Sequence, residues 1–274
     1  MPSRAVLITG AAGGLGAVMT AALLKDGHAV AAVDRSREGL ARLVASLGAG
    51  RERLLPVEAE LSEPVACTRA VEAAVAHFGR IEGVVNNAGI GMSAIRPDAE
   101  SNHPGIAELT ADVWDRFFAV NVRAPLMITQ AALPHMKRAG WGRIVNNTTS
   151  YRTMLRVLPY GATKSALESM SAVWALELDG TGITVNVLVP GGPTDTPFIN
   201  DAAGWPRNQM LKPAIMGPPI SWLMSEASNG VNGKRFTAQH WDALLPPAEA
   251  AMKAARHIGW PELAAGPAWF TTTL

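Results

Sequence analysis

The sequence has little of several features that would point to other classes of protein. It contains one cysteine, Cys67, in 274 residues, which excludes an internal disulfide framework and suggests a reducing compartment, the cytoplasm. The 24 basic and 23 acidic residues give a net charge of +1, without long runs of one sign, so we expect no nucleic-acid partner. No apolar stretch is long enough to span a bilayer and no signal-peptide pattern is present, so we expect no membrane partner.

Sequence motifs of several enzyme classes are also missing. The six histidines show no ligand spacing and no H-E-x-x-H string occurs, so no metal site is expected. Neither G-x-S-x-G nor a P-loop string is present, which argues against an α/β-hydrolase and a P-loop NTPase. Hydrophobic residues, in contrast, make up 48% of the chain, enough for a large buried core.

The first part of the chain reads as an apolar strand, a glycine-rich turn, a helix and a second strand that closes on Asp34. Glycine allows the tight turn and lets a pyrophosphate approach the N–H groups at the start of the helix, whose dipole favours an anion. This order predicts a dinucleotide-binding βαβ unit. The expected contacts in the turn are Gly10, Ala12, Gly13, Gly14, Leu15 and Gly16.

Strand and helix patterns alternate through the rest of the chain. This predicts one α/β domain over residues 1–240, a doubly wound Rossmann-type parallel sheet with helices on both faces. Helices are expected near 40–47, 65–78, 110–137, 159–178 and 221–224, and strands near 54–57, 83–87, 143–147, 184–189 and 234–237. Residues 241–274 form a tail expected to pack on the domain or on a neighbouring subunit, through Trp241, Trp260, Trp269 and Phe270.

A phenol and an ammonium lie four residues apart at the start of a predicted helix, at Tyr160 and Lys164, and therefore share one helix face. A nearby cation and the positive end of the helix both favour phenolate, which would give a proton donor and acceptor for an alcohol or carbonyl oxygen. The alternative is a half-buried tyrosine beside a surface lysine. Polar motifs after three predicted strands, at 86–89, 148–150 and 190–192, place a crevice at the carboxyl edge of the same sheet.

The combined order of motifs resembles the short-chain dehydrogenase/reductase family over about residues 5–236. These motifs are T-G-x-x-x-G-x-G, N-N-A-G, an asparagine in the long helix, hydroxyls after a strand, Y-x-x-x-K and P-G. The resemblance implies NAD(P)-dependent oxidation of a secondary alcohol or reduction of a ketone. It makes Tyr160 the acid–base, with Lys164 lowering its pKa and holding the nicotinamide ribose. Asn121 would support a water-linked proton relay to Lys164.

Two residues are candidates for the hydroxyl that should act together with Tyr160 and Lys164. The family usually has a catalytic serine there; strand register places Thr149 in that position, whereas a shorter connection to Tyr160 would favour Ser150. Either hydroxyl can donate to a carbonyl oxygen. We favour Thr149, and the alternative is that the hydroxyls only cap the strand end.

The cofactor predicted from the sequence is NAD. A carboxylate at Asp34 accepts hydrogen bonds from the ribose hydroxyls and repels a 2′-phosphate, with Arg35 as the one residue that would tolerate NADP. Near the adenine the chain has Glu60 and Leu61 where the family usually has an aspartate. In the loop over 190–196, Thr196 is favoured over Thr194 as the hydroxyl that contacts the nicotinamide amide, since this loop is one residue longer than is usual in the family. The resemblance adds contacts from Asn87, Ala88, Gly89, Pro190, Gly191 and Gly192.

The expected substrate is a small-molecule alcohol or ketone, hydrophobic or cyclic, because the segments that could wall a pocket are mostly apolar. Those segments are 90–93, 152–157 and 198–216, with Met92, Met154, Leu155, Trp205 and Met210. Residues 90–107 form a longer connection than the family usually has there. We expect a homodimer or homotetramer. An NADP-dependent carbonyl reductase, a non-catalytic NAD-binding sensor or scaffold, and a lyase or epimerase with transiently used NAD are the alternatives.

Overall fold

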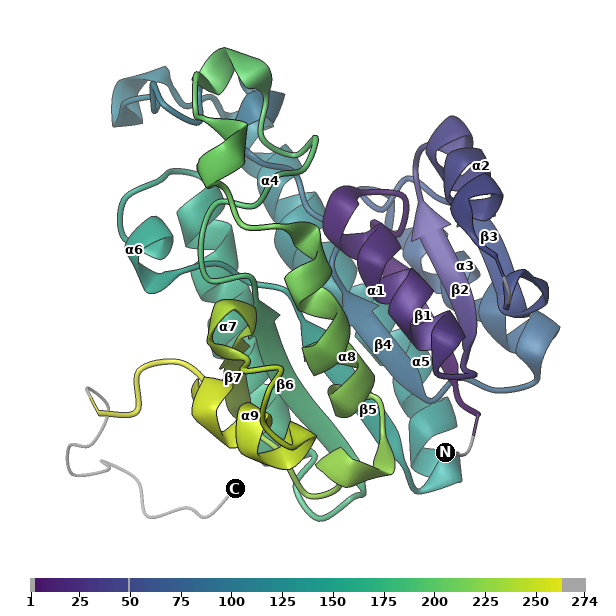
Figure 1. The fold of residues 1–274 in the computed structure, drawn as a ribbon. Helices are drawn as coiled ribbons and strands as arrows, with labels where there is room; N and C mark the ends of the chain where they lie inside the picture. The colour runs from purple at the N-terminus through teal and green to yellow at the C-terminus, as the bar shows by residue number, and fades with distance from the viewer. Residues whose placement is uncertain (1–2, 49, 263–274) are drawn as a thin grey trace.

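The computed structural model describes residues 3–48 and 50–262, and its centre is an eight-stranded sheet (Figure 1). The strand order is β3-β2-β1-β4-β5-β6-β7-β8, and neighbouring strands are parallel except β7 and β8. The predicted Rossmann-type sheet is confirmed. The strands are β1 (Ala5–Thr9), β2 (Ala29–Asp34), β3 (Leu54–Glu58), β4 (Gly83–Asn86), β5 (Gly142–Asn146), β6 (Ile183–Val189), β7 (Lys234–Thr237) and β8 (Ala255–His257).

Helices cover both faces of the sheet because parallel strands need crossover connections. The chain order reverses between β1 and β4, and the carboxyl ends of these two strands therefore open a crevice. The α-helices are α1 (Gly14–Lys25), α2 (Arg37–Ser46), α3 (Pro64–Phe78), α4 (Ala111–Phe118), α5 (Ala124–Ala139), α6 (Tyr151–Met154), α7 (Tyr160–Glu177), α8 (Gly217–Leu223) and α9 (Pro247–Ala254).

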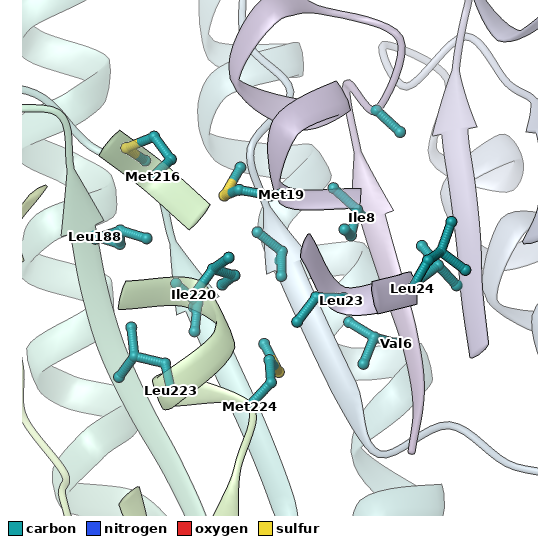
Figure 2. Close-up of a cluster of buried hydrophobic side chains, with 14 of the residues drawn as sticks. Val6, Ile8, Met19, Leu23, Leu24, Leu188, Met216, Ile220, Leu223 and Met224 are labelled. Carbon is teal, nitrogen blue, oxygen red and sulfur yellow. The ribbon is translucent and has the colours of Figure 1, made fainter. Parts of the chain in front are cut away.

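The core consists of two apolar layers, one on each face of the sheet. In the first layer, α1 and α8 pack against the central strands, with Met19 and Leu23 facing Ile220 and Leu223 (Figure 2). The second layer is formed by α3, α5 and the end of α7. Every residue of β1, β4, β5 and β6 is buried, so these strands are fixed from both sides and hold the crevice rigidly.

The predicted long helix over 110–137 is broken in the structure. Thr110 caps α4 as expected, accepting a hydrogen bond from the Val113 N–H at 3.3 Å. Helix α4 then gives way to a π-helical turn, η4 (Ala119–Arg123), before α5 begins. Pro125 supplies the physical reason: it has no N–H to donate to the carbonyl of Asn121, four residues earlier, so the α-helical ladder is interrupted there.

The segment after residue 240 adds to the same sheet. Helix α9 leads into β8, which pairs antiparallel with β7. The ring centroid of Trp241 lies 6.1 Å from that of Trp222, and that of Trp260 lies 5.8 Å from that of Tyr151. Trp269 and Phe270 fall outside the described residues. Within the described part of the chain, no helix has the length and apolarity needed to cross a membrane.

Candidate active site

The glycine turn between β1 and α1 is shaped by close approaches of backbone and side chain. Gly10 has a φ of +64°, which strongly favours glycine. A Cβ on Gly16 would stand 2.1 Å from the Gly10 carbonyl oxygen, and one on Gly14 would stand 2.4 Å from Cγ2 of Thr196. Gly16 therefore lets the turn close on itself, and Gly14 lets the loop after β6 lie directly over the start of α1, where the first N–H groups have no intrahelical partners.

The carboxylate of Asp34 is fixed at the end of β2 by two backbone donors. Oδ2 accepts from the Ala12 N–H and Oδ1 from the Ser36 N–H, both at 3.0 Å. Each carboxylate oxygen can accept a further hydrogen bond. The neighbouring Arg35 is exposed. The structure thus presents a negative charge beside the glycine turn.

The ends of β1, β4 and β5 are joined by side-chain hydrogen bonds. The Thr9 hydroxyl accepts from the N–H groups of both Asn87 and Ala88 at 3.0 Å. The Asn87 amide also donates to the Thr9 carbonyl at 3.0 Å and accepts from the Asn147 side chain at 2.9 Å. The predicted N-N-A-G motif therefore holds three strand ends in register at the crevice.

Lys164 is buried on the first turns of α7 and points into this crevice. Its Nζ donates to the Asn147 carbonyl oxygen at 2.8 Å and lies 5.8 Å from the ring centroid of Tyr160. An ammonium has three donors, so two remain for a ligand. A Cβ on Gly89 would stand 3.5 Å from this Nζ and 3.2 Å from Oδ1 of Asn121, so the lack of a side chain at Gly89 keeps the approach open.

Burial shifts the two titratable groups in opposite directions, because it disfavours the charged form of each. It lowers the pKa of Lys164 from 10.5 to about 8. It also raises the pKa of Tyr160 well above its ordinary value, as does the charge of Glu100, while a hydrogen bond with Thr149 lowers it. In the protein alone, desolvation therefore dominates the pKa of Tyr160, and the lowering of that pKa by Lys164 stays a prediction for the enzyme with its cofactor.

Asn121 lies in the π-helical turn η4 and is fully buried. Its Oδ1 accepts from the Ile90 N–H at 2.8 Å, and its Nδ2 donates to the Ile90 carbonyl at 3.1 Å and to the Thr163 hydroxyl at 3.0 Å. The side chain thus links the loop after β4 to α7. Its backbone carbonyl is the one to which Pro125 cannot donate, because proline has no N–H.

The two candidate hydroxyls after β5 have different neighbours. The Thr149 side chain hydrogen-bonds with Tyr160. The Ser150 hydroxyl instead caps the short helix α6, accepting from the Thr153 N–H at 3.1 Å and lying 2.9 Å from the Thr153 hydroxyl. The structure therefore brings Thr149, and not Ser150, to the phenol.

The loop after β6 turns at Gly191, whose φ is +109°, and then passes through two buried threonines. The Thr194 hydroxyl is turned back to the Gly192 carbonyl at 3.1 Å, whereas Thr196 covers Gly14. Glu60 is exposed, its side chain accepting from the Ser62 N–H at 3.1 Å, and Leu61 is buried behind it.

Comparison with known proteins identifies the family to which this arrangement belongs. A model of the short chain dehydrogenase family matches residues 4–206. D-threitol dehydrogenase of Mycolicibacterium smegmatis is 33% identical over 245 residues, which are 85% of this chain and 90% of that protein. The chain belongs to the short-chain dehydrogenase/reductase family.

Solved structures of this family superpose on the chain. A 3-ketoacyl-(acyl-carrier-protein) reductase from Brucella melitensis complexed with NADH gives a TM-score of 0.70 at 29% identity, over 84% of this chain and 93% of that one. A blue fluorescent protein from a metagenomic library in complex with NADPH gives 0.72 at 28% identity, over the same shares of the two chains. The fold is thus one that binds a nicotinamide cofactor, and its neighbours include both forms.

Beside this short-chain dehydrogenase/reductase site lies a buried ion pair that the sequence analysis missed. Arg235 on β7 and Glu168 on α7 are 2.5 Å apart, with side chains 6% and 0% exposed. Arg235 also donates to the Thr149 carbonyl, and the Thr148 hydroxyl donates to Glu168 at 2.7 Å. Positions on different elements carry no sequence signal of such a contact. The pair holds the backbone of the segment that carries Thr149.

Two loops cover the crevice beyond the carboxyl ends of the strands, at the top of Figure 1. The loop between β4 and α4 meets the loop after β6 where the Ser93 hydroxyl donates to the Phe198 carbonyl at 3.4 Å. Met92 and Met210 are buried inside these two loops. Leu155, in the third segment expected to wall the pocket (152–157), is 79% exposed. Each of the two loops is thus held together by a small cluster of buried apolar side chains that is separate from the main core.

Proposed function

We propose that this short-chain dehydrogenase/reductase is an NAD-dependent enzyme that interconverts a secondary alcohol and a ketone. The observation that carries the proposal is the convergence of four side chains at one crevice. Tyr160 and Lys164 share a face of α7, Thr149 hydrogen-bonds with the phenol, and Asn121 lies against α7 through Thr163. A proton donor and acceptor, a hydroxyl for the substrate oxygen and a cation are the parts that such a reaction needs.

In the direction of oxidation, Tyr160 would accept the proton of the substrate hydroxyl while Thr149 donates a hydrogen bond to the same oxygen. When bound, NAD would supply the hydride acceptor for this oxidation. Lys164 has two free donors for the ribose hydroxyls and one bond to the Asn147 carbonyl that fixes its position. Both loops over the crevice would exclude water from the reacting oxygen.

NAD is the proposed cofactor because of the charge at the end of β2. The Asp34 carboxylate keeps acceptor capacity for two ribose hydroxyls, and its backbone donors hold it where a 2′-phosphate would have to lie. The glycine turn supports binding of a dinucleotide in general, since a side chain at Gly14 or Gly16 would collide with Thr196 or with the Gly10 carbonyl and displace the turn.

The substrate is proposed to be a hydrophobic or cyclic alcohol, bounded by Phe198 and the loop after β4. The aromatic ring of Phe198 lies 5.8 Å from that of Tyr160, centroid to centroid, and is 39% exposed. A homodimer or homotetramer is also proposed. It is supported by exposed apolar side chains on the outer face of α7, Val173 and Leu176, which are 56% and 73% exposed.

The experiment is turnover of a panel of cyclic alcohols with NAD, followed by NADH absorbance, in two matched variants. The chain has two tyrosines, Tyr160 and Tyr151, and the hydroxyl of the second lies 2.9 Å from the Gly259 carbonyl oxygen and 3.3 Å from Oε1 of Glu168. We expect Tyr160→Phe to lower kcat at least a thousandfold with NAD affinity retained, and Tyr151→Phe to stay within tenfold of the parent. Equal turnover in Tyr160→Phe and the parent would refute the proposal. Tight NAD binding without any turnover in the parent would favour a sensor.

A further inference from the structure

One buried carboxylate oxygen at the substrate side of the crevice accepts no hydrogen bond. It is Oε1 of Glu100, in the long connection between β4 and α4. Ala99 beside it is fully buried and anchors this part of the loop among Met92, Phe117 and Val157. A buried acceptor without a donor is costly, and native proteins rarely keep one without a use.

The loop's own cation is directed elsewhere. Arg96 pairs with Asp98 at 3.1 Å and with Glu108 at 3.5 Å, and its remaining donor reaches the Asn102 carbonyl at 2.5 Å. In the described part of the chain no lysine or arginine forms an ion pair with Glu100. The carboxylate is therefore not neutralised by the arginine of its own loop.

Local donors compensate this carboxylate only in part. Burial raises the pKa of Glu100, while the backbone N–H groups of Met92 and Ser93 and the charge of His103 lower it by less. A carboxylate accepts hydrogen bonds, and an added donor would stabilise it.

The position of the carboxylate relative to the reacting groups is set by Gly91. A Cβ on Gly91 would stand 3.2 Å from Oε1 of Glu100 and 2.5 Å from the ring of Phe198. The backbone of Gly91 has φ −104° and ψ −174°, which any residue adopts, so the missing side chain matters for space rather than for conformation. Glu100 and the substrate-covering ring of Phe198 thus meet at one point.

The charge of the same carboxylate acts on the proposed acid–base. Its charge raises the pKa of Tyr160, and the Phe198 ring that it approaches lies 5.8 Å from the Tyr160 ring, centroid to centroid. A substrate that places its carbinol oxygen at Tyr160 and rests on Phe198 therefore has its far side directed towards Glu100.

We propose that Glu100 accepts a hydrogen bond from a donor group of the substrate, a hydroxyl or an ammonium separate from the carbon that is oxidised. This assignment rests on the proposed alcohol dehydrogenase function and narrows it. The substrate class becomes diols or amino alcohols with an apolar body, because the rest of the wall is apolar while one acceptor is unfilled.

The test compares kcat/KM for cyclohexanol, the cyclohexanediols and trans-4-aminocyclohexanol in the parent, Glu100→Gln and Glu100→Leu. We expect the parent to prefer at least one donor-bearing substrate tenfold or more over cyclohexanol. Glu100→Leu should reduce that preference about 10- to 100-fold, the effect of one charge-assisted hydrogen bond, and Glu100→Gln should reduce it less. If Glu100→Leu reduces the preference for the amino alcohol alone, the donor that Glu100 binds is an ammonium. If it reduces the preference for a diol, that donor is a hydroxyl.

Glu108→Gln is the matched control, since it removes a carboxylate of the same loop that is exposed and already paired with Arg96. It should leave the preference unchanged. A preference that is the same in Glu100→Leu as in the parent would overturn this assignment while the dehydrogenase function stands. If the parent oxidises no alcohol, the proposed function fails, and calorimetric binding of trans-4-aminocyclohexanol then decides the Glu100 assignment: equal affinity in the parent and Glu100→Leu overturns it, and tenfold weaker binding in the variant supports it.

Discussion

Exchanging Glu168 or Arg235 for methionine tests how far the fold and the site depend on one buried ion pair. Arg235 contacts Glu168 and also donates to the Thr148 hydroxyl at 3.0 Å and to the Thr149 carbonyl. Glu168 has further donors from Thr148, the Tyr151 hydroxyl at 3.3 Å and the Gly259 N–H at 3.2 Å. The two partners are therefore unequally supported by the rest of the protein.

Breaking a buried pair costs about 3–5 kcal/mol, because the remaining charge is uncompensated. We expect Arg235→Met to lower the free energy of unfolding by about 3 kcal/mol, at the low end, since three donors still face Glu168. Glu168→Met should cost about 5 kcal/mol, because a guanidinium stays charged and would retain a hydroxyl, a carbonyl and the Tyr151 ring as partners, but no anion. The double variant should lose only about 1–3 kcal/mol, since no unpaired charge remains and only neutral groups such as the Thr149 carbonyl and the Gly259 N–H lose a partner.

Urea unfolding of the parent, both single variants and the double variant measures these values in one thermodynamic cycle. Activity gives a second readout: Arg235→Met should lower kcat more than it raises KM, because Arg235 holds the backbone of Thr149 and does not touch the substrate. If the two single losses add to the double loss within about 0.5 kcal/mol, the pair is not coupled and the reasoning is refuted. A larger loss from Arg235→Met than from Glu168→Met would refute the unequal support.

Three further predictions concern the site itself. Thr149→Ala should lower kcat by about 10²–10³, whereas Ser150→Ala should keep kcat and lose about 1 kcal/mol of stability as a helix cap; the reverse order would exchange their roles. Asp34→Ala should raise KM for NAD and reduce the ratio of kcat/KM with NAD to kcat/KM with NADP. A ratio equal to that of the parent would contradict the role of the Asp34 charge. Burial places the pKa of Lys164 at about 8, so its ammonium is lost above that pH; NAD affinity, followed by tryptophan fluorescence, should weaken as pH rises through 8, and constant affinity from pH 7 to 9 would contradict this.

The fold could be predicted from the sequence because its signals are local. The glycine turn, the alternation of apolar strands and amphipathic helices, and the four-residue spacing of Tyr160 and Lys164 each depend on neighbours within one or two helical turns. Parallel strands then require crossovers of fixed hand, which collects the strand-end motifs at one edge. The nucleotide crevice therefore follows from short-range patterns alone.

The break in the long helix was also present in the sequence, at Pro125, but its meaning depends on what lies opposite. A proline four residues after Asn121 interrupts one hydrogen bond, and only the packing against Ile90 and Thr163 turns that break into a link between two elements. A helical period continues on both sides of the break, so the pattern by itself predicts one helix.

Tertiary structure alone decided the contacts between residues distant in sequence. It directed Thr149 to the phenol and Ser150 to a helix cap, paired Glu168 with Arg235, and buried Tyr160 within reach of the charge of Glu100, so that desolvation raises the pKa of the phenol. Such contacts depend on loop paths and on the distances between elements, which no residue spacing encodes. The sequence by itself therefore determined the sheet, the nucleotide turn and the tyrosine–lysine pair, because local geometry suffices for these. The electrostatics around that pair were decided only by folding, because burial and distant charges set them.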